Sequence, residues 1–196
     1  AACLADVFTL EVALRLIATR GRLIQQQRPG SMLAIMRSEQ ECRSFLGDTL
    51  TIAAVNAPGS CVVSGETEHI ESLAETLQRE SISCRLLKTS HAFHYQMMEP
   101  VVAPFEEVVS QVELNPPTIP FVSNVSGQWI KDEEAVDPSY WTNHLRHGVL
   151  FAKGMETVLA TDGLSLLEIG PGHTLTALAR QHPSCSAEQV IVASMP

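Results

Sequence analysis

The sequence lacks long apolar runs and is poor in basic residues. No segment approaches the ~20 consecutive apolar residues that a membrane-spanning helix requires. Lysine and arginine total 13 against 22 aspartate and glutamate residues, which gives a formal net charge of −9 at pH 7. Nucleic acids and anionic membrane surfaces bind basic patches, so this balance argues against nucleic acid and membrane as the main partners.

The cysteines form no motif. Their number is odd, their spacing is wide and no CxxC pair occurs, with the five at Cys3, Cys42, Cys61, Cys84 and Cys185. A disulfide framework or a zinc site would require paired cysteines at closer spacing. We therefore expect reduced thiols and a cytoplasmic protein.

The sequence also lacks an N-terminal methionine and a GxSxG motif, and we expect its start not to be a signal peptide. No basic residue precedes the apolar start AACLADVFTL, which excludes a secretion signal of the usual form. We expect the chain to be part of a longer polypeptide. GxSxG places a nucleophilic serine on a strand-to-helix turn. The nearest approaches to it, Ser64-Gly65 and Ser90-His91, lie in no such turn.

The first 30 residues predict one long helix. Thr9 is a suitable N-cap residue, and Arg28-Pro29-Gly30 is a stop signal. Apolar residues between them recur at helical spacing, opposite the charged Glu11, Arg15 and Arg22. We expect the apolar face to be buried, and it consists of Leu10, Ala13, Leu14, Ile17, Ala18, Leu23 and Ile24.

A compact unit follows at residues 30–89. Ser38 and Glu41 have the spacing of a capping box, which opens a short helix. The remaining patterns predict strands at 31–37, 50–56, 60–64 and 83–88, and helices at 38–46 and 67–80. This β-α-β-β-α-β order is typical of a ferredoxin-like subdomain.

The rest of the chain predicts α/β structure. We expect a helix over 95–112 bent by its prolines, a strand at 121–125, an exposed acidic loop at 131–138, helices at 139–146 and 151–161, a buried strand at 165–169, a helix at 174–181 and a strand at 190–193. Strand, glycine turn, helix and strand in succession indicate parallel pairing. The predicted fold class is therefore α/β with an inserted ferredoxin-like subdomain.

The strongest local signal is the motif His91-Ala92-Phe93-His94, where the compact unit returns to the rest of the chain. Loops held between rigid units often carry catalytic groups, and the imidazole pKa suits a general base. A partly buried histidine with a local hydrogen bond would give the same pattern. No third ligand of matching spacing follows the two histidines, so we predict no metal.

Arg20 and two further positions are candidates for ligand binding. An arginine in a cleft binds a carboxylate through two parallel hydrogen bonds, although a solvated surface arginine is the alternative. Gly21 costs ~1 kcal/mol in a helix, which indicates close packing or room for a ligand. Asn56 either starts a turn or lines a cleft. Gly170-Pro171-Gly172 forms either a tight turn or an anion site at a helix N-terminus.

Eight stretches in order carry a family resemblance that covers essentially the whole chain. They are AACLADVFTLEVALRLIATRGRLIQ (1–25), SMLAI (31–35), AAVNAPGSCVVSG (53–65), HAFHYQMMEP (91–100), IPFVSNVSG (119–127), YWTNHLRHGVLF (140–151), LLEIGPGHTLTAL (166–178) and VIVASMP (190–196). Together they resemble the acyltransferase domains of modular and iterative polyketide synthases. More distantly, they resemble the malonyl-CoA:acyl-carrier-protein transacylases of fatty acid synthesis.

The resemblance implies an α/β-hydrolase-like acyltransferase core, incomplete at its N-terminus, formed by residues 1–29 and 90–196. In that family a GHSxGE serine elbow lies a few residues before the AACLA stretch. The resemblance therefore implies that the nucleophilic serine, and the oxyanion N–H that follows it, lie outside this chain. We accordingly expect the chain to be inactive alone.

The resemblance also implies roles for individual residues. His94 would take the serine proton and later protonate the leaving thiolate, and the backbone carbonyl of His144 would orient its ring. Arg20 would pair with the free carboxylate of malonate, and Asn56 would lie in the cleft.

The HAFH form of the motif resembles that of the malonyl-selective class, whereas methylmalonyl-selective domains tend to have YASH. His91 and Phe93 would thus face the substrate. Phe93 is bulkier than serine and would crowd a 2-methyl branch.

The implied substrates and partners are malonyl-CoA, the phosphopantetheine thiol of an acyl carrier protein, and the neighbouring ketosynthase and linker domains. No bound cofactor is implied. An acyltransferase-like scaffold without chemistry is the alternative, and the residue at the elbow would separate the two. A free-standing ferredoxin-like binding module is disfavoured because residues 31–89 offer only Phe45 as an aromatic.

Overall fold

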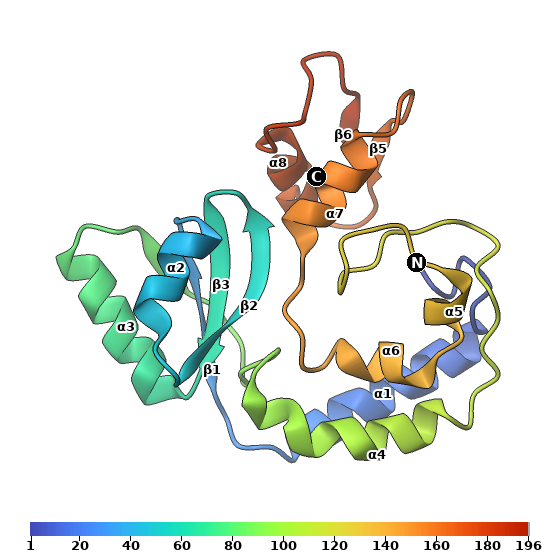
Figure 1. Cartoon of the computed structure of the whole chain (residues 1–196), viewed down its shortest axis with the longest axis horizontal. Helices are drawn as coiled ribbons and strands as arrows, with labels where there is room; N and C mark the ends of the chain where they lie inside the picture. Colours follow the sequence, from blue (N-terminus) through green and yellow to red (C-terminus); the bar gives the residue numbers. More distant parts are fainter. Residues whose placement is uncertain (196) are drawn as a thin grey trace.

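The computed structural model describes residues 1–195, which form a mixed α/β fold of three connected parts. A four-stranded sheet with two helices makes a small lobe, on the left in Figure 1. The long helices α1 and α4 run along the bottom of that view, and a short two-stranded sheet with its helices lies at the top. No helix within 1–195 is long and apolar enough to cross a membrane.

The small lobe has the element order predicted from the sequence. Its elements are β1 (Ser31–Ile35), α2 (Glu39–Leu46), β2 (Leu50–Ala57), β3 (Ser60–Gly65), α3 (Thr67–Arg79) and β4 (Cys84–Leu86). The strands pair antiparallel in the order β2-β3-β1-β4. Apolar residues of α2 and α3 pack on one sheet face around the fully buried Leu33, Ile35 and Val63. The last strand is shorter than expected.

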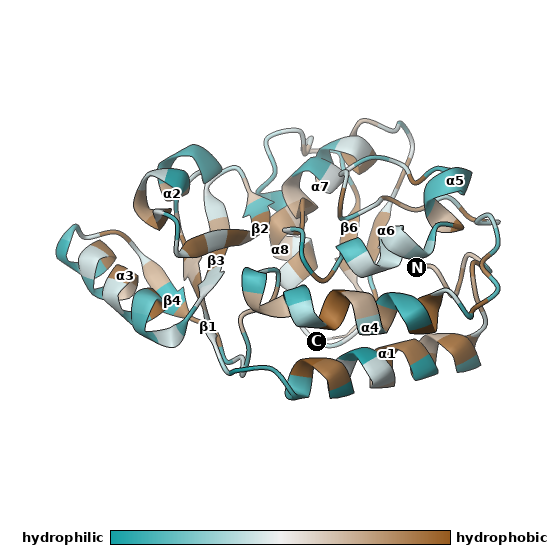
Figure 2. Cartoon of the chain, turned by 60° about the horizontal axis from the view of Figure 1, so that its bottom comes forward, coloured by the Kyte–Doolittle hydropathy of each residue, from teal (hydrophilic) through white to brown (hydrophobic). Residues whose placement is uncertain are grey.

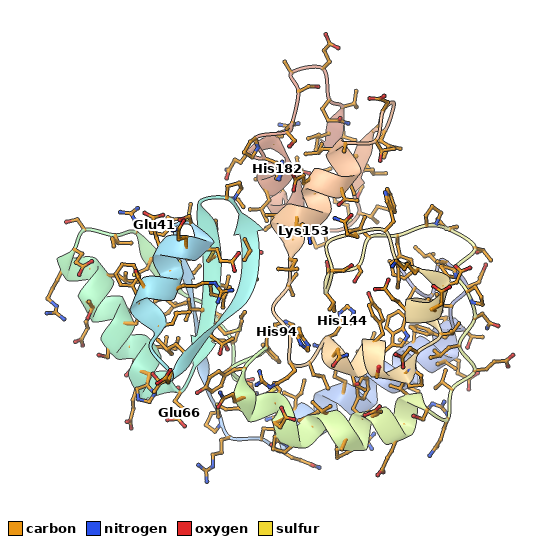
Figure 3. The ribbon with its side chains drawn as sticks, viewed as in Figure 1. Glu41, Glu66, His94, His144, Lys153 and His182 are labelled. Carbon is orange, nitrogen blue, oxygen red and sulfur yellow. The ribbon has the colours of Figure 1, made fainter. Side chains whose placement is uncertain are left out.

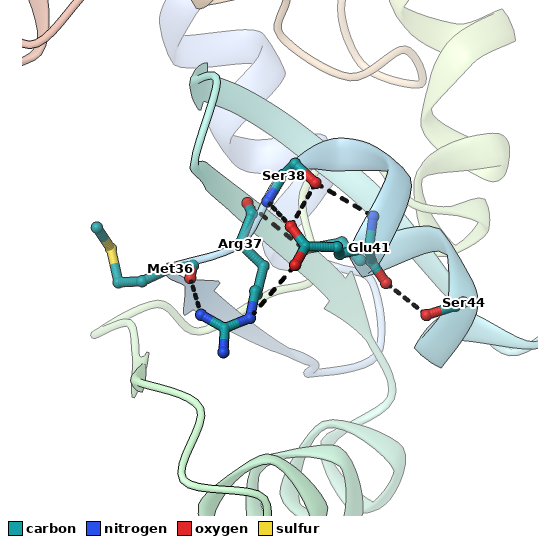
Figure 4. A network of polar contacts seen from close by, with 6 residues as sticks. Met36, Arg37, Ser38, Glu41 and Ser44 are labelled. Carbon is teal, nitrogen blue, oxygen red and sulfur yellow. Dashed lines mark hydrogen bonds and ion pairs between the residues drawn. The ribbon is translucent and has the colours of Figure 1, made fainter.

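The predicted capping box is present at the start of α2 (Figure 4). The Ser38 backbone N–H donates to Glu41 Oε2 at 2.9 Å, and Ser38 Oγ accepts from the Glu41 backbone N–H at 3.4 Å. Hydrogen bonds from Ser38 lower the pKa of the Glu41 carboxyl, and Arg37 lies 3.6 Å from it. Two N–H groups that a helix start leaves unpaired are thereby satisfied.

The first helix, α1 (Leu10–Gln25), buries only part of the predicted face, with Ala13 and Ile24 inside it and Leu16 added to them. Leu10, Leu14 and Ile17 are 60–67% exposed, whereas the buried positions are Ala13, Leu16 and Ile24. The helix is apolar on more than one side, so periodicity alone does not select the face. The packed side is the one that meets α4 (Glu99–Val109), and Figure 2 shows α1 at the edge of the chain with hydrophobic colour along its length.

The long helix predicted for 95–112 is shorter and begins differently. A 3₁₀ turn, η1 (Gln96–Met98), leads into α4, whose first turn accommodates Pro100. Proline suits the first turn because its missing N–H would be unpaired there anyway. Pro104 lies inside the helix, and α4 ends at Val109.

Two expectations for the segment before α6 (Pro138–Asn143) are wrong. Residues 121–125 form no strand, only an isolated bridge between Val122 and Trp129. The acidic stretch contains a short helix, α5 (Asp132–Ala135), in which the Glu134 carboxylate caps the Lys131 N–H at 2.9 Å. Acidic side chains in the first turn of a helix interact favourably with the helix dipole. An acidic stretch is therefore as compatible with the start of a helix as with an exposed loop.

The C-terminal part confirms parallel pairing but not a buried strand. Strands β5 (Leu166–Glu168) and β6 (Ile191–Ala193) pair in parallel, accompanied by α7 (Phe151–Leu159) and α8 (Thr174–Arg180). Leu167 and Ile169 are 56% and 82% exposed because this sheet has only two strands within residues 1–195. A run of apolar residues indicates that a strand favours burial, but it does not show that another element packs against that strand.

The Gly170-Pro171-Gly172 turn leaves no room for an external anion on the first N–H groups of α8. Glu168 Oε1 and Oε2 accept from the Leu175 and Thr176 N–H groups at 3.0 and 2.8 Å. These bonds lower the pKa of the Glu168 carboxyl. The turn therefore serves to let a strand carboxylate cap the following helix.

The small lobe is tied to the rest of the chain through the segment before α7. The Val149 N–H donates to the Ala53 carbonyl at 2.8 Å, and the Val55 N–H donates to the Val149 carbonyl at 2.9 Å. A Cβ on Gly148 would lie 2.6 Å from the Ile52 carbonyl oxygen, so only glycine fits this approach. The bridge holds the segment after α6 against β2.

Candidate functional site

His94 lies in a strained turn between the small lobe and the helices. Its φ is 59°, in the left-handed region that non-glycine residues rarely adopt. Such strain costs of order 1–3 kcal/mol and persists where the surroundings impose it, often at functional sites. The turn is therefore a candidate for function on conformational grounds, independently of sequence pattern.

The surroundings of His94 favour the neutral imidazole. Burial lowers the pKa of His94, the nearby charge of Arg20 lowers it further, and the backbone carbonyls of His147 and His144 oppose these effects. Nδ1 is buried and has no well-formed hydrogen bond to any of residues 1–195. The two carbonyls favour the charged form of the ring, although neither forms a well-aligned hydrogen bond with Nδ1. The neutral ring can therefore accept a proton, and the carbonyls would stabilise the imidazolium that results.

Arg20 points into the same region from the last turns of α1. Burial lowers the pKa of its guanidinium, and the charge of Arg20 acts on both His94 and His144. Within residues 1–195 no carboxylate lies within 4.0 Å of it. A partly buried guanidinium without a counter-ion is costly, so this position is suited to an anionic ligand.

Gly21, next to Arg20, does not mark close packing. A Cβ built at Gly21 would meet nothing within 4 Å, and α1 continues through it to Gln25. Of the two alternatives predicted for Gly21, close packing is therefore wrong, and room for a ligand stays a prediction.

His144 lies in an aromatic clamp at the end of α6 (Pro138–Asn143), near His94 (Figure 3). Its ring stacks on Trp141 with centroids 6.1 Å apart and an interplanar angle of 11°, and Tyr140 meets it edge-on at 4.9 Å. Burial, followed by the charges of Arg20 and His94, lowers the pKa of His144 to about 4. The clamp fixes the residue whose backbone carbonyl faces His94.

We expect His144 to titrate near pH 4 and to make the fold acid-sensitive. Its folded pKa of about 4 lies below the ordinary value of 6.5, so between these values the unfolded chain binds more protons. The free energy of unfolding should fall as the pH drops from 6.5 to 4. An NMR titration of the His144 ring checks the value, and His144→Asn should weaken the acid sensitivity. A His144 pKa near 6.5 would contradict the claim that the ring is buried between Tyr140 and Trp141.

His91 and Phe93 have structural contacts of their own. His91 is 4% exposed and its Nδ1 bonds to Ser90 Oγ at 2.8 Å, so the local-hydrogen-bond alternative describes His91. The Phe93 ring lies 6.5 Å from it and packs against apolar clusters of both the small lobe and the helices. Packing from two sides therefore restricts the movement of the Phe93 ring.

The hydrogen bonds and burial of the other candidates give them no part in the site around His94. Asn56 is half-buried on β2, beside the strand's bridge to Val149, and its place in a cleft stays a prediction. Ser64 is fully buried with its Oγ unpaired within the described chain, which rules it out as an accessible nucleophile. Ser90 bonds to its neighbour His91.

Three contributors to the site escaped sequence reasoning. Tyr140 and Trp141 clamp His144, and His147 presents its backbone carbonyl to His94. All three lie in the family-like stretch 140–151, but no role was predicted for them, because an aromatic pair in a short helix equally indicates ordinary core packing. Within residues 1–195, no group of three or more His, Cys, Asp or Glu side chains is arranged to hold a metal ion.

Solved structures with a similar fold include acyltransferase domains. The acyl transferase domain of SpnD, in complex with 2-(pent-4-yn-1-yl)malonyl, superposes with a TM-score of 0.93 and 35% identity, over 99% of this chain and 47% of that one. The acyltransferase domain from the second module of the salinomycin polyketide synthase superposes with a TM-score of 0.91 and 34% identity, over 100% of this chain and 46% of that one. The mixed α/β fold is therefore that of acyltransferase domains.

Sequence comparison agrees. The family model described as acyl transferase domain matches residues 1–195, so the chain belongs to this family of transferases. It is 37% identical over 186 residues to one component of the phenolphthiocerol/phthiocerol polyketide synthase of Mycobacterium tuberculosis, covering 95% of this chain and 12% of that protein. It is 38% identical over 193 residues to the spectinabilin polyketide synthase system protein NorB of Streptomyces orinoci, covering 96% and 9%.

Proposed function

We propose that this chain is part of a malonyl-transferring domain of a polyketide synthase. Malonyl would move from coenzyme A to a serine and then to the phosphopantetheine thiol of an acyl carrier protein. The observation that carries the proposal is the convergence of a neutral, buried imidazole with an unpaired guanidinium, from separate elements. A relative solved with a substituted malonyl group supports a dicarboxylic acyl group as the substrate.

His94 supplies the proton transfers in this proposal. The neutral ring takes the proton of the serine hydroxyl as the oxygen attacks the thioester carbon, and the resulting imidazolium gives the proton to the departing thiolate of coenzyme A. The second half-reaction runs the same steps with the carrier thiol as the attacking group. The His144 and His147 carbonyls favour the imidazolium that forms between the two transfers.

Arg20 selects the acyl group. Its guanidinium pairs with the free carboxylate of malonyl through two parallel hydrogen bonds. An acetyl group leaves that guanidinium without a counter-charge in a partly buried site, and this difference discriminates between the two acyl groups. No carboxylate of residues 1–195 occupies the position in competition.

The sequence contains no GxSxG motif. In this proposal the serine hydroxyl is supplied by polypeptide outside residues 1–196, as the family resemblance implies. On this proposal the chain alone does not form the acyl-serine. A scaffold without chemistry would present the same chain beside an elbow that lacks serine. The residue at that elbow therefore separates the enzyme from the scaffold.

The proposed architecture follows from the same resemblance. Residues 30–89 form a ferredoxin-like subdomain, supported by the strand order β2-β3-β1-β4, and residues 1–29 with 90–196 belong to an α/β-hydrolase-like core. We place the reaction in the cytoplasm, with the carrier protein and neighbouring ketosynthase and linker domains as partners. The thioesters of coenzyme A and phosphopantetheine serve as substrates rather than bound cofactors.

A selectivity assay tests the proposal. With the chain joined to a GxSxG-bearing segment, malonyl-CoA should acylate the serine faster than methylmalonyl-CoA. The reason is that Phe93, held by two apolar clusters, excludes the extra methyl group. Phe93→Ser should narrow the preference by about 10–200-fold, the usual worth of one methyl group in a pocket. An unchanged preference in Phe93→Ser would remove Phe93 from selectivity, and no acylation by either thioester would contradict the function.

A further inference from the structure

The turn that carries His94 is fastened to the small lobe on its N-terminal side. The Gly30 backbone N–H donates to the Ser90 carbonyl at 3.3 Å. The Ala92 methyl is fully buried, and a Cβ on Gly30 would lie 2.6 Å from it. Residue 30 must therefore be glycine for the turn to sit this close to the start of β1.

The C-terminal side of the turn is fastened by Tyr95. This residue is 7% exposed, and its hydroxyl donates to the Thr49 carbonyl at 2.9 Å, just before β2. Its own carbonyl accepts from the Met98 N–H at 2.9 Å and so begins η1. Tyr95 thus links the small lobe to the helix that follows the turn.

His94 itself does little to fix its own orientation. Its Nδ1 is buried without a well-formed hydrogen bond within residues 1–195, although ring orientation in catalytic histidines usually depends on such a bond. Its φ of 59° is a strained value that its neighbours must impose. The two fastenings on either side are the contacts that can do so.

We infer that Tyr95 is a positioning residue, and that its hydroxyl bond to the Thr49 carbonyl holds the left-handed turn that aims the His94 ring into the site. This inference rests on the proposed function, because the orientation of the ring matters only if His94 transfers the proton. It assigns the small lobe a part in the chemistry, because Thr49 and Gly30 both belong to that lobe. Tyr95 touches no reacting atom and acts only through His94.

The test is an NMR titration of His94 in the whole chain, in wild type and Tyr95→Phe. Phenylalanine keeps the buried ring and removes only the hydroxyl. The His94 ring faces Arg20 on α1 and the residues His144 and His147 at the end of α6. When the turn relaxes, the ring should gain solvent. Its pKa should then rise toward the ordinary value, with broadened resonances.

The matched control is Thr118→Val, which removes one hydroxyl from a bond to Asp6 at 2.8 Å, between segments far apart in sequence. Thr118 is exposed, so its variant should lower the melting temperature no more than Tyr95→Phe does, and it should leave the His94 titration unchanged. Equal His94 titration curves in wild type and Tyr95→Phe would overturn the inference. So would an equal shift of His94 in Thr118→Val.

A second pair of variants tests the other fastening without relying on Tyr95. Gly30→Ala should shift the His94 titration in the same direction, because its methyl group collides with Ala92. Adding Ala92→Gly should bring the titration back toward wild type. No shift in Gly30→Ala would contradict the inference. Since none of these readouts requires acyl transfer, failure of the proposed function would leave them intact, and the two failures can be told apart.

Discussion

Replacing His94 with alanine should lower malonyl transfer by about 10²–10⁴-fold, the usual contribution of a positioned general base. The expectation applies to the chain joined to a segment that supplies the serine. Without the imidazole the proposed base is missing, and the neighbouring Arg20 cannot replace it because its guanidinium holds no free lone pair. The measurement is the single-turnover rate of serine acylation by malonyl-CoA.

The matched control for this prediction is His69→Ala, at an exposed histidine on α3 of the small lobe. It removes the same side chain and should leave the acylation rate unchanged. If His94→Ala acylates the serine at the wild-type rate, His94 is not the base, and this conclusion does not depend on the result for His69→Ala.

Replacing Arg20 with alanine should cost malonyl transfer about 1.5–3 kcal/mol, the usual worth of a hydrogen bond to a charged group. Acetyl transfer should survive or rise, because acetyl offers no carboxylate and no longer faces an unpaired guanidinium. The measurement is the ratio of kcat/KM for malonyl-CoA and acetyl-CoA. Arg20→Lys should recover part of the loss, since it keeps the charge but loses the planar fork.

Arg22→Ala serves as the control for Arg20, because Arg22 is exposed near the end of the same helix. It should change neither rate. If Arg20→Ala reduces malonyl and acetyl transfer by the same factor, Arg20 stabilises the structure and does not select the substrate.

The small lobe was the part of the fold that sequence reasoning predicted best. Its strands are short apolar runs bounded by turn residues, and its first helix opens on the Ser38–Glu41 capping box. Each of these signals is local, and all agree with one another. Agreement between local signals is what makes an element predictable from one sequence.

Burial in the rest of the chain was predicted less well, for a physical reason. Leu14 and Ile17 have the periodicity of a core face but are exposed, and Leu167 lies in an apolar strand with more than half its surface in solvent. Periodicity reports which faces are apolar. It cannot report which of them finds a neighbour, because that depends on elements distant in sequence or outside the chain.

The site was predictable only in part. His94 and Arg20 were singled out from residue type and local pattern, and their roles came from the family resemblance. The Tyr95 contact to Thr49 joins residues 46 positions apart and leaves no local trace. Likewise, the positive φ of His94 is imposed by packing on both sides of the turn and not by a glycine that the sequence would reveal.

The most direct test of the account is the pH dependence of single-turnover serine acylation. A neutral His94 must accept the proton, so the rate should rise with pH and level off. Burial and Arg20 lower the pKa of His94, so the midpoint should lie below 6.5 in wild type, and the rise should be absent in His94→Ala. A midpoint well above 6.5, or the same profile in both proteins, would contradict the claim that this imidazole is the base.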